Sequence, residues 1–189
     1  MEKINMKKFL LLAGVALFTA NSANAAYMSE VKPYIGADYV YSRAHQGGVA
    51  KGFKKDFNSG KVDLGLQLYN NWYMEFSSQM SGELKNRRAY DGSTVKNKFQ
   101  AYAMDMYGKY PLMCSNLSAL VSGGAAIYHL SYKGLDGKNT DRVGYRAGVG
   151  MQYDFNKNWA ARVLGRYSYL GMDRLNNFKE VTVGMLYRF

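Results

Sequence analysis

The residues of this sequence best suited to chemistry are two histidines, His45 and His129, and a single cysteine, Cys114. A histidine acts as a general base only with a nucleophile or an orienting carboxylate within hydrogen-bond reach. Two distant histidines and one cysteine make no ligand cluster for a metal ion. The glycines at 123–124, 148 and 150 lie in strand-like stretches, not in a phosphate-binding loop. We therefore predict no enzyme, no cofactor and no metal, and we expect the cysteine to be an inert thiol in a turn.

The charged residues carry a stronger signal, because in eight stretches they fall on alternate positions. Successive side chains of a strand point to opposite faces, so one parity marks one face. In the interior of these stretches, the alternate positions that hold the apolar residues carry no charged residue. The opposite parity carries Asp38, Lys61, Asp63, Glu75, Asp105, Lys109, Arg146, Asp154, Arg162, Arg166, Glu180 and Arg188.

The eight stretches are residues 34–42, 61–69, 72–80, 101–110, 117–129, 144–155, 159–169 and 179–189. The last is the clearest, since every second residue from Val181 to Phe189 is apolar. With 20 glycines, 17 tyrosines and two prolines, the composition favours strands and turns over helices. The sequence therefore predicts an all-β protein.

Alternation does not say which face points inward, and a lipocalin-like barrel would bury the apolar face. Three features favour a barrel whose apolar face points outward and contacts lipid. Connections alternate between short ones, such as 156–158, and long ones, such as 43–58 and 81–98. Each stretch approaches the ~9–11 residues that cross the hydrocarbon. Aromatics line both ends of the apolar face, as at membrane interfaces: Trp72, Tyr110, Tyr153, Phe155, Trp159 and Phe189 at one end, Tyr41, Tyr145, Tyr167 and Tyr169 at the other. We predict an eight-stranded antiparallel up-and-down transmembrane β-barrel.

Eight strands enclose a space that side chains fill, so the lumen should hold paired charges and no wide channel. Closure brings the first and last strands together, which could place Asp38 near Arg188 or Glu180. The network would serve as structure or, alternatively, as a gate that exchanges ion partners. Its expected members are Asp38, Asp63, Glu75, Asp105, Arg146, Arg162, Arg166, Glu180 and Arg188.

The start of the chain has the pattern of a secretory signal peptide. Lys7 and Lys8 precede an apolar run, 9–20, and Ala23 and Ala25 suit a signal peptidase. We predict a cleaved signal peptide over 1–25 and a barrel over 26–189, exported to the bacterial outer membrane. Translation could start at Met1 or Met6.

The formal net charge of +11 is concentrated in part in the two long loops. Such cations would lie beside lipopolysaccharide phosphates or bind acidic host glycans. An exported barrel is not expected to bind nucleic acid, and we expect a monomer. The candidate cationic contacts are Arg43, Lys51, Lys54, Lys55, Lys85, Arg87 and Arg88.

Four short motifs resemble the transmembrane domain of the OmpA family and its OmpX- and opacity-type relatives. They span 34–37, 108–111, 148–153 and 184–189. The resemblance implies that Tyr187 and Phe189 form a signal read by the barrel-assembly machinery. It also implies a lumenal Glu–Arg cluster, matched by Glu75 and Arg162, although Gln152 stands where that family has an acid.

Three functions are consistent with these observations: a barrel for envelope integrity or surface adhesion, a narrow porin with a gated lumen, or a loop-borne lipid A acyl-modifying enzyme. The third rests on His45 with Asp91 and Ser93, which weakly resembles lipid A palmitoyltransferase. We also expect no counterpart of the His–Ser pair that lipid A deacylases carry on a late strand. The first function is our prediction.

Overall fold

The computed structural model describes residues 31–46, 56–69, 71–87, 94–112, 116–133, 140–171 and 175–189. Contacts divide the chain into two units, 1–31 and 32–189. The first contains the predicted signal peptide and lies, except for Val31, outside the described residues. The second unit is the barrel. Among the described residues, no helix is both long and apolar enough to span a membrane.

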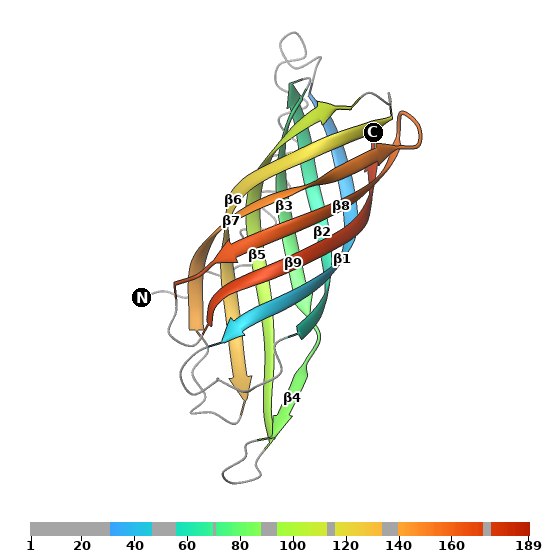
Figure 1. The fold of residues 1–189 in the computed structure, drawn as a ribbon. Helices are drawn as coiled ribbons and strands as arrows, with labels where there is room; N and C mark the ends of the chain where they lie inside the picture. Colours follow the sequence, from blue (N-terminus) through green and yellow to red (C-terminus); the bar gives the residue numbers. More distant parts are fainter. Residues whose placement is uncertain are drawn as a thin grey trace, which may run out of the picture. The chain divides into compact units, whose positions relative to one another are not determined.

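The second unit is an antiparallel barrel, which confirms the predicted fold class (Figure 1). Its strands are β1 (Lys32–Gln46), β2 (Asp56–Tyr69), β3 (Trp72–Ser81), β4 (Leu84–Arg87), β5 (Thr94–Pro111), β6 (Leu117–Lys133), β7 (Thr140–Asp154), β8 (Trp159–Tyr169) and β9 (Leu175–Arg188). Neighbours in sequence pair in order, and pairing of β1 with β9 closes the sheet.

The third barrel strand is interrupted, which is why nine segments form eight strands. Both β3 and β4 pair with β5, and the break lies at Gly82 and Glu83. The hydroxyl of Ser81 accepts a hydrogen bond from the Phe99 amide at 2.8 Å, and the Gly82 amide donates to the Asn58 carbonyl at 2.8 Å. These bonds satisfy the amides of Phe99 and Gly82 beside the break.

The strands extend beyond the predicted stretches at the end opposite the C-terminus. Four of them begin earlier than expected, at Asp56, Thr94, Thr140 and Leu175. At that end β4 and the adjacent ends of β5 and β6 project beyond the other strands (Figure 1). The predicted stretches covered only the part of each strand that crosses the lipid. Hydrogen bonds between neighbouring strands extend the strands beyond it, towards the end opposite the C-terminus. The segments between these strands, 47–55 and 88–93, lie outside the described residues and are shorter than the loops predicted from the sequence.

The opposite end has short connections, as predicted. In the turn before β8, the Asn156 side chain accepts hydrogen bonds from the amides of Asn158, at 2.9 Å, and Trp159, at 2.8 Å. Asparagine favours tight turns because its side chain can bond the backbone two residues on. The C-terminus lies at this end, where the Phe189 amide donates to the Pro33 carbonyl at 3.2 Å.

Burial shows which face of the sheet points outward. Val62 leaves 60% of its surface exposed, while the adjacent Lys61 leaves only 2%. All ten aromatic residues predicted for the two rims are exposed. A protein folded in water would show the reverse, because burying charges and exposing aliphatic side chains both cost free energy. The apolar face therefore contacts lipid.

Candidate functional site

The centre of the lumen holds a compact ion cluster around Arg162 of β8. Its guanidinium contacts Asp38 at 2.7 Å, Asp63 at 2.7 Å and Glu75 at 2.5 Å. The Lys61 ammonium contacts the same carboxylates at 2.6, 2.9 and 3.4 Å. All five side chains are almost completely buried. Two cations therefore hold three carboxylates that could not be buried alone.

Two tyrosines complete the coordination of Glu75. The hydroxyls of Tyr34 and Tyr107 donate to its carboxylate at 3.1 and 3.0 Å. The Arg162 guanidinium lies 5.5 Å from the centroid of the Tyr107 ring, within range of a cation–π interaction. Glu75 is thus bound by hydrogen bonds as well as ion pairs, which holds the cluster in one arrangement.

A second ion cluster continues from the first. Arg146 binds Asp105 through two nitrogens, with Nε to Oδ1 at 2.6 Å, and donates to the Ser77 hydroxyl at 3.1 Å. Arg166 lies between Asp105, at 3.7 Å, and Glu180, at 3.9 Å. Arg166 also donates to the Tyr107 hydroxyl at 2.9 Å, which links the two clusters. Eight of the nine predicted lumenal residues therefore lie in one continuous network, to which the structure adds Lys61.

The ninth predicted residue, Arg188, lies apart at the end near the C-terminus. It contacts Asp154 at 2.5 Å, and Asp154 also binds Lys109 at 2.6 Å. The prediction that Asp38 approaches Arg188 or Glu180 is wrong. In the β1–β9 register Asp38 lies opposite Gly184, between those two residues. A Cβ on Gly184 would lie 1.6 Å from Asp38 Oδ1, so the glycine provides the room that this carboxylate occupies.

Apolar layers close the lumen on both sides of the ions, a feature absent from the predicted polar lumen. Towards the long loops, Phe57, Phe99, Tyr128 and Phe178 pack together, with Phe99 and Phe178 centroids 4.9 Å apart. Three of these residues lie on strand extensions outside the predicted stretches. Continuing the alternation would have found them, since Phe57, Phe99 and Phe178 share the parity of the charges.

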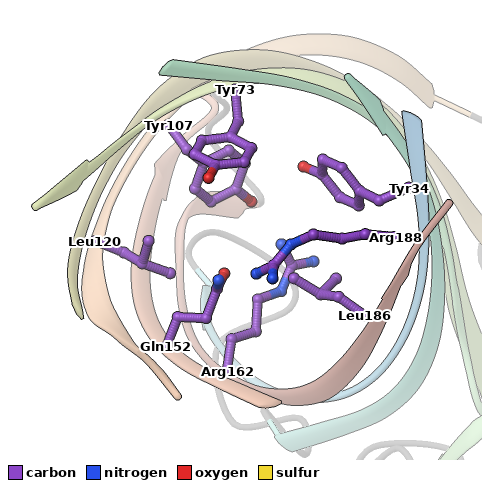
Figure 2. Close-up of a pocket in the computed structure, with 8 residues that line it drawn as sticks. All are labelled: Tyr34, Tyr73, Tyr107, Leu120, Gln152, Arg162, Leu186 and Arg188. Carbon is purple, nitrogen blue, oxygen red and sulfur yellow. The ribbon is translucent and has the colours of Figure 1, made fainter. Parts of the chain in front are cut away.

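The layer on the other side contains Tyr34, Tyr73, Tyr107, Leu120 and Leu186. Figure 2 shows these side chains converging with Arg162, Gln152 and Arg188 around a small cavity. The cavity measures about 10 Å³, room for roughly one water molecule. Side chains thus close the lumen at the level of the ions and of both apolar layers.

The predicted cationic contacts fall into two groups. Lys51, Lys54, Lys55 and Arg88 lie outside the described residues, as do Asp91, Ser93 and Cys114. Arg43, Lys85 and Arg87 belong to strands β1 and β4, so their assignment to loops is wrong. Arg43 also forms an ion pair with Asp56 at 2.8 Å.

The outer end, which carries the long loops, has a shallow pocket formed by β1, β2 and β9. It is lined by Arg43, Ala44, His45, Asp56, Asn177 and Lys179. Arg43 and Lys179 lie directly opposite each other across the β1–β9 pair, and both are exposed. Like charges at such positions repel, so an anion bound between them would be stabilising.

A histidine and a carboxylate make contact on the outward face of the outer end. His129 Nδ1 lies within hydrogen-bond reach of Asp141 Oδ1. Ser131 follows two residues later on the same face of β6. Among the described residues, no three His, Cys, Asp or Glu side chains are grouped so as to hold a metal ion.

The predicted assembly signal lies at the end of β9, on the lipid-facing side. Phe189 is 67% exposed, and its ring packs edge-on against Tyr187 at 5.3 Å. Tyr187 in turn contacts Trp159 at 5.0 Å. These rings form a continuous aromatic surface, whose recognition by an assembly machinery remains a prediction.

Comparison with solved structures shows the same fold at low sequence identity. Neisserial surface protein A shares 16% identity with a TM-score of 0.66, covering 83% of this chain and 97% of its own. Ail of Yersinia pestis, solved with the heparin analogue sucrose octasulfate, shares 18% identity with a TM-score of 0.57, covering 85% and 99%. The N-terminal β-barrel domain of Pseudomonas aeruginosa OprF shares 14% identity with a TM-score of 0.55, covering 82% and 97%.

No curated protein sequence matches this chain. One protein family does match: the outer membrane protein beta-barrel domain, over residues 10–189. The match spans all the strands of the structure, and the burial pattern agrees with a lipid-facing exterior. This chain belongs to the family of outer membrane protein β-barrel domains.

Proposed function

We propose that this protein is a closed barrel of the bacterial outer membrane that binds acidic glycans at its outer end. The observation that carries the proposal is the exposed cross-strand pair of Arg43 and Lys179 in the outer pocket. Two cations at adjacent positions, of which Arg43 is also paired with Asp56 at 2.8 Å, favour a ligand with closely spaced negative charges, such as a sulfated sugar. The structural similarity to Ail, solved with a heparin analogue, supports this ligand class.

Further cations lie on other strands of the outer end, outside the lining of this pocket. Lys85 and Lys98 are exposed on β4 and β5. Lys51, Lys54, Lys55 and Arg88 belong to the segments that join the strands there. Lys96 is paired with Glu83 at 2.9 Å and contributes less. The outer end therefore offers positive charge on the described strands and in the adjoining sequence.

Binding to heparin-coated surfaces tests the proposal. We expect the double variant Arg43→Gln and Lys179→Gln to bind cells to heparin at least several-fold more weakly, with a further loss when Lys51, Lys54, Lys55, Arg87 and Arg88 are also neutralised. A weaker effect is expected at high salt, because salt screens exposed charges.

The control removes the same charge from the opposite end. Lys32 and Lys157 are exposed near the C-terminal end of the barrel, so Lys32→Gln with Lys157→Gln should leave binding unchanged. Equal binding by the Arg43/Lys179 variant and this control would exclude the outer pocket as the glycan site. Fractionation of cells confirms that each variant reaches the outer membrane in equal amount.

A further inference from the structure

Three groups on the outward face of β6 and β7 have the chemistry of a hydrolase. His129 and Asp141 lie opposite each other in the β6–β7 register, and Nδ1 of the imidazole contacts the carboxylate. A carboxylate at Nδ1 holds the imidazole in the tautomer whose Nε2 accepts a proton. The ring of Tyr102 packs edge-on against His129 at 6.1 Å, which restricts its orientation further.

Ser131 stands beside this pair as a possible nucleophile. It follows His129 by two residues, and the intervening Leu130 points into the lumen with 4% exposure. His129 and Ser131 therefore share the outward face, with Cα atoms about 7 Å apart. Side chains on a strand lean along its axis, so the imidazole and the hydroxyl together can bridge that separation.

The neighbouring strand supplies groups suited to stabilise negative charge. In the β5–β6 register Lys98 lies opposite Ser131, and Gln100 lies opposite His129. An ammonium and an amide beside the nucleophile are the donors that a developing oxyanion requires. Nucleophile, base, orienting carboxylate and oxyanion donors thus come from three adjacent strands.

The position of these groups indicates the class of substrate. Ile127 lies two residues before His129 on the same face of β6, nearer the centre of the strand, and is 43% exposed on the lipid-facing band. The side chain of Asp141 is 62% exposed and that of His129 24%. The three groups therefore lie where the apolar band meets the outer end. An ester-linked lipid of the outer leaflet would place its acyl chain against the band and its carbonyl beside Ser131.

We propose that Ser131, His129 and Asp141 hydrolyse a fatty-acyl ester of an outer-leaflet lipid. Ser131 Oγ bonds to the ester carbonyl carbon as its proton passes to His129 Nε2. The carbon–oxygen bond to the lipid alcohol then breaks, and the alcohol takes that proton. Water, deprotonated by His129, attacks the acyl-serine, releasing the fatty acid and returning the proton to Ser131. Asp141 orients the imidazole and stabilises its charged form.

The full-length barrel in detergent micelles, with p-nitrophenyl palmitate as probe, tests this activity. We expect nitrophenol release to fall at least about 100-fold in Ser131→Ala and in His129→Asn, the effect of removing a nucleophile or a general base. Asp141→Asn should lower the rate and change its pH profile, which a purely structural role would not do. The matched control is Ser78→Ala, an outward serine on β3 that should keep the wild-type rate.

A fluorophosphonate probe supplies a second readout that does not need turnover. Peptide mass spectrometry should find the label on Ser131, and it should disappear in Ser131→Ala while Ser78→Ala retains it. Heat-modifiable migration in unboiled gels confirms that each variant is folded. Wild-type hydrolysis no faster than that of Ser131→Ala, or wild-type protein without label on Ser131, would overturn the proposal.

Discussion

Glu75 shows at the scale of one residue what holds the lumen together. Its carboxylate is fully buried and binds Arg162, Lys61 and the hydroxyls of Tyr34 and Tyr107. Removing one member of a buried ion pair leaves its partners charged and desolvated. The stability of the cluster therefore depends on its being complete.

We predict that Glu75→Ala lowers the free energy of unfolding by about 3–5 kcal/mol, the usual effect of breaking a buried ion pair. Urea unfolding of the barrel in lipid vesicles, followed by tryptophan fluorescence, measures this change. The control is Glu83→Ala, which removes an exposed partner of Lys96 and should cost less than about 1 kcal/mol. Equal losses in the two variants would contradict a structural role of the cluster.

At the scale of elements, the strands are organised by the solvent on each face. On β9, Val181, Val183 and Met185 face lipid, while Glu180, Thr182 and Gly184 face the lumen. The lipid-facing residues are hydrophobic because no water is available to solvate a charge there. Among the lumenal residues, Glu180 accepts a hydrogen bond from Ser42 and lies near Arg166, whereas Gly184 leaves room for Asp38.

We predict that Val183→Arg, in the middle of this face, costs about 2–4 kcal/mol, whereas Val143→Arg, near the outer rim of β7, costs about 0–1 kcal/mol. The difference arises because a charge near the interface reaches water and one at the bilayer centre does not. Urea unfolding in vesicles compares the two variants. A cost independent of depth would refute the assignment of this face to lipid.

At the scale of the whole barrel, two apolar layers and the ion network between them fill the described lumen. An ion crossing it would have to displace aromatic rings and separate buried ion pairs. The filled lumen supports a closed barrel over the narrow porin considered from the sequence. Both proposed sites lie outside the lumen, at the outer end.

We predict no single-channel current when the folded barrel is inserted in planar bilayers at neutral pH. Heat-modifiable migration of the same preparation shows that the inserted protein is folded. Discrete current steps that recur in independent preparations would favour the porin alternative. Their loss in Arg162→Met would then identify the central cluster as the gate.

The sequence by itself determined the face of each side chain, because alternation is a local property of an extended chain. Parity alone separated lumenal charges such as Asp38 and Arg162 from lipid-facing residues such as Val183. It could also have located Phe57 and Phe99, had the strands been extended beyond the hydrocarbon. The fold class followed from the same local signal.

Only the tertiary structure decided which residues are partners. Asp38 binds Lys61 and Arg162, not Arg188. The offset between neighbouring strands of the closed barrel sets the height of each residue along the barrel axis. No local pattern in the sequence encodes that offset. The contact of His129 with Asp141 has the same origin, since the β6–β7 register brings together residues of two different strands. Local geometry fixed the faces, and barrel closure fixed the contacts.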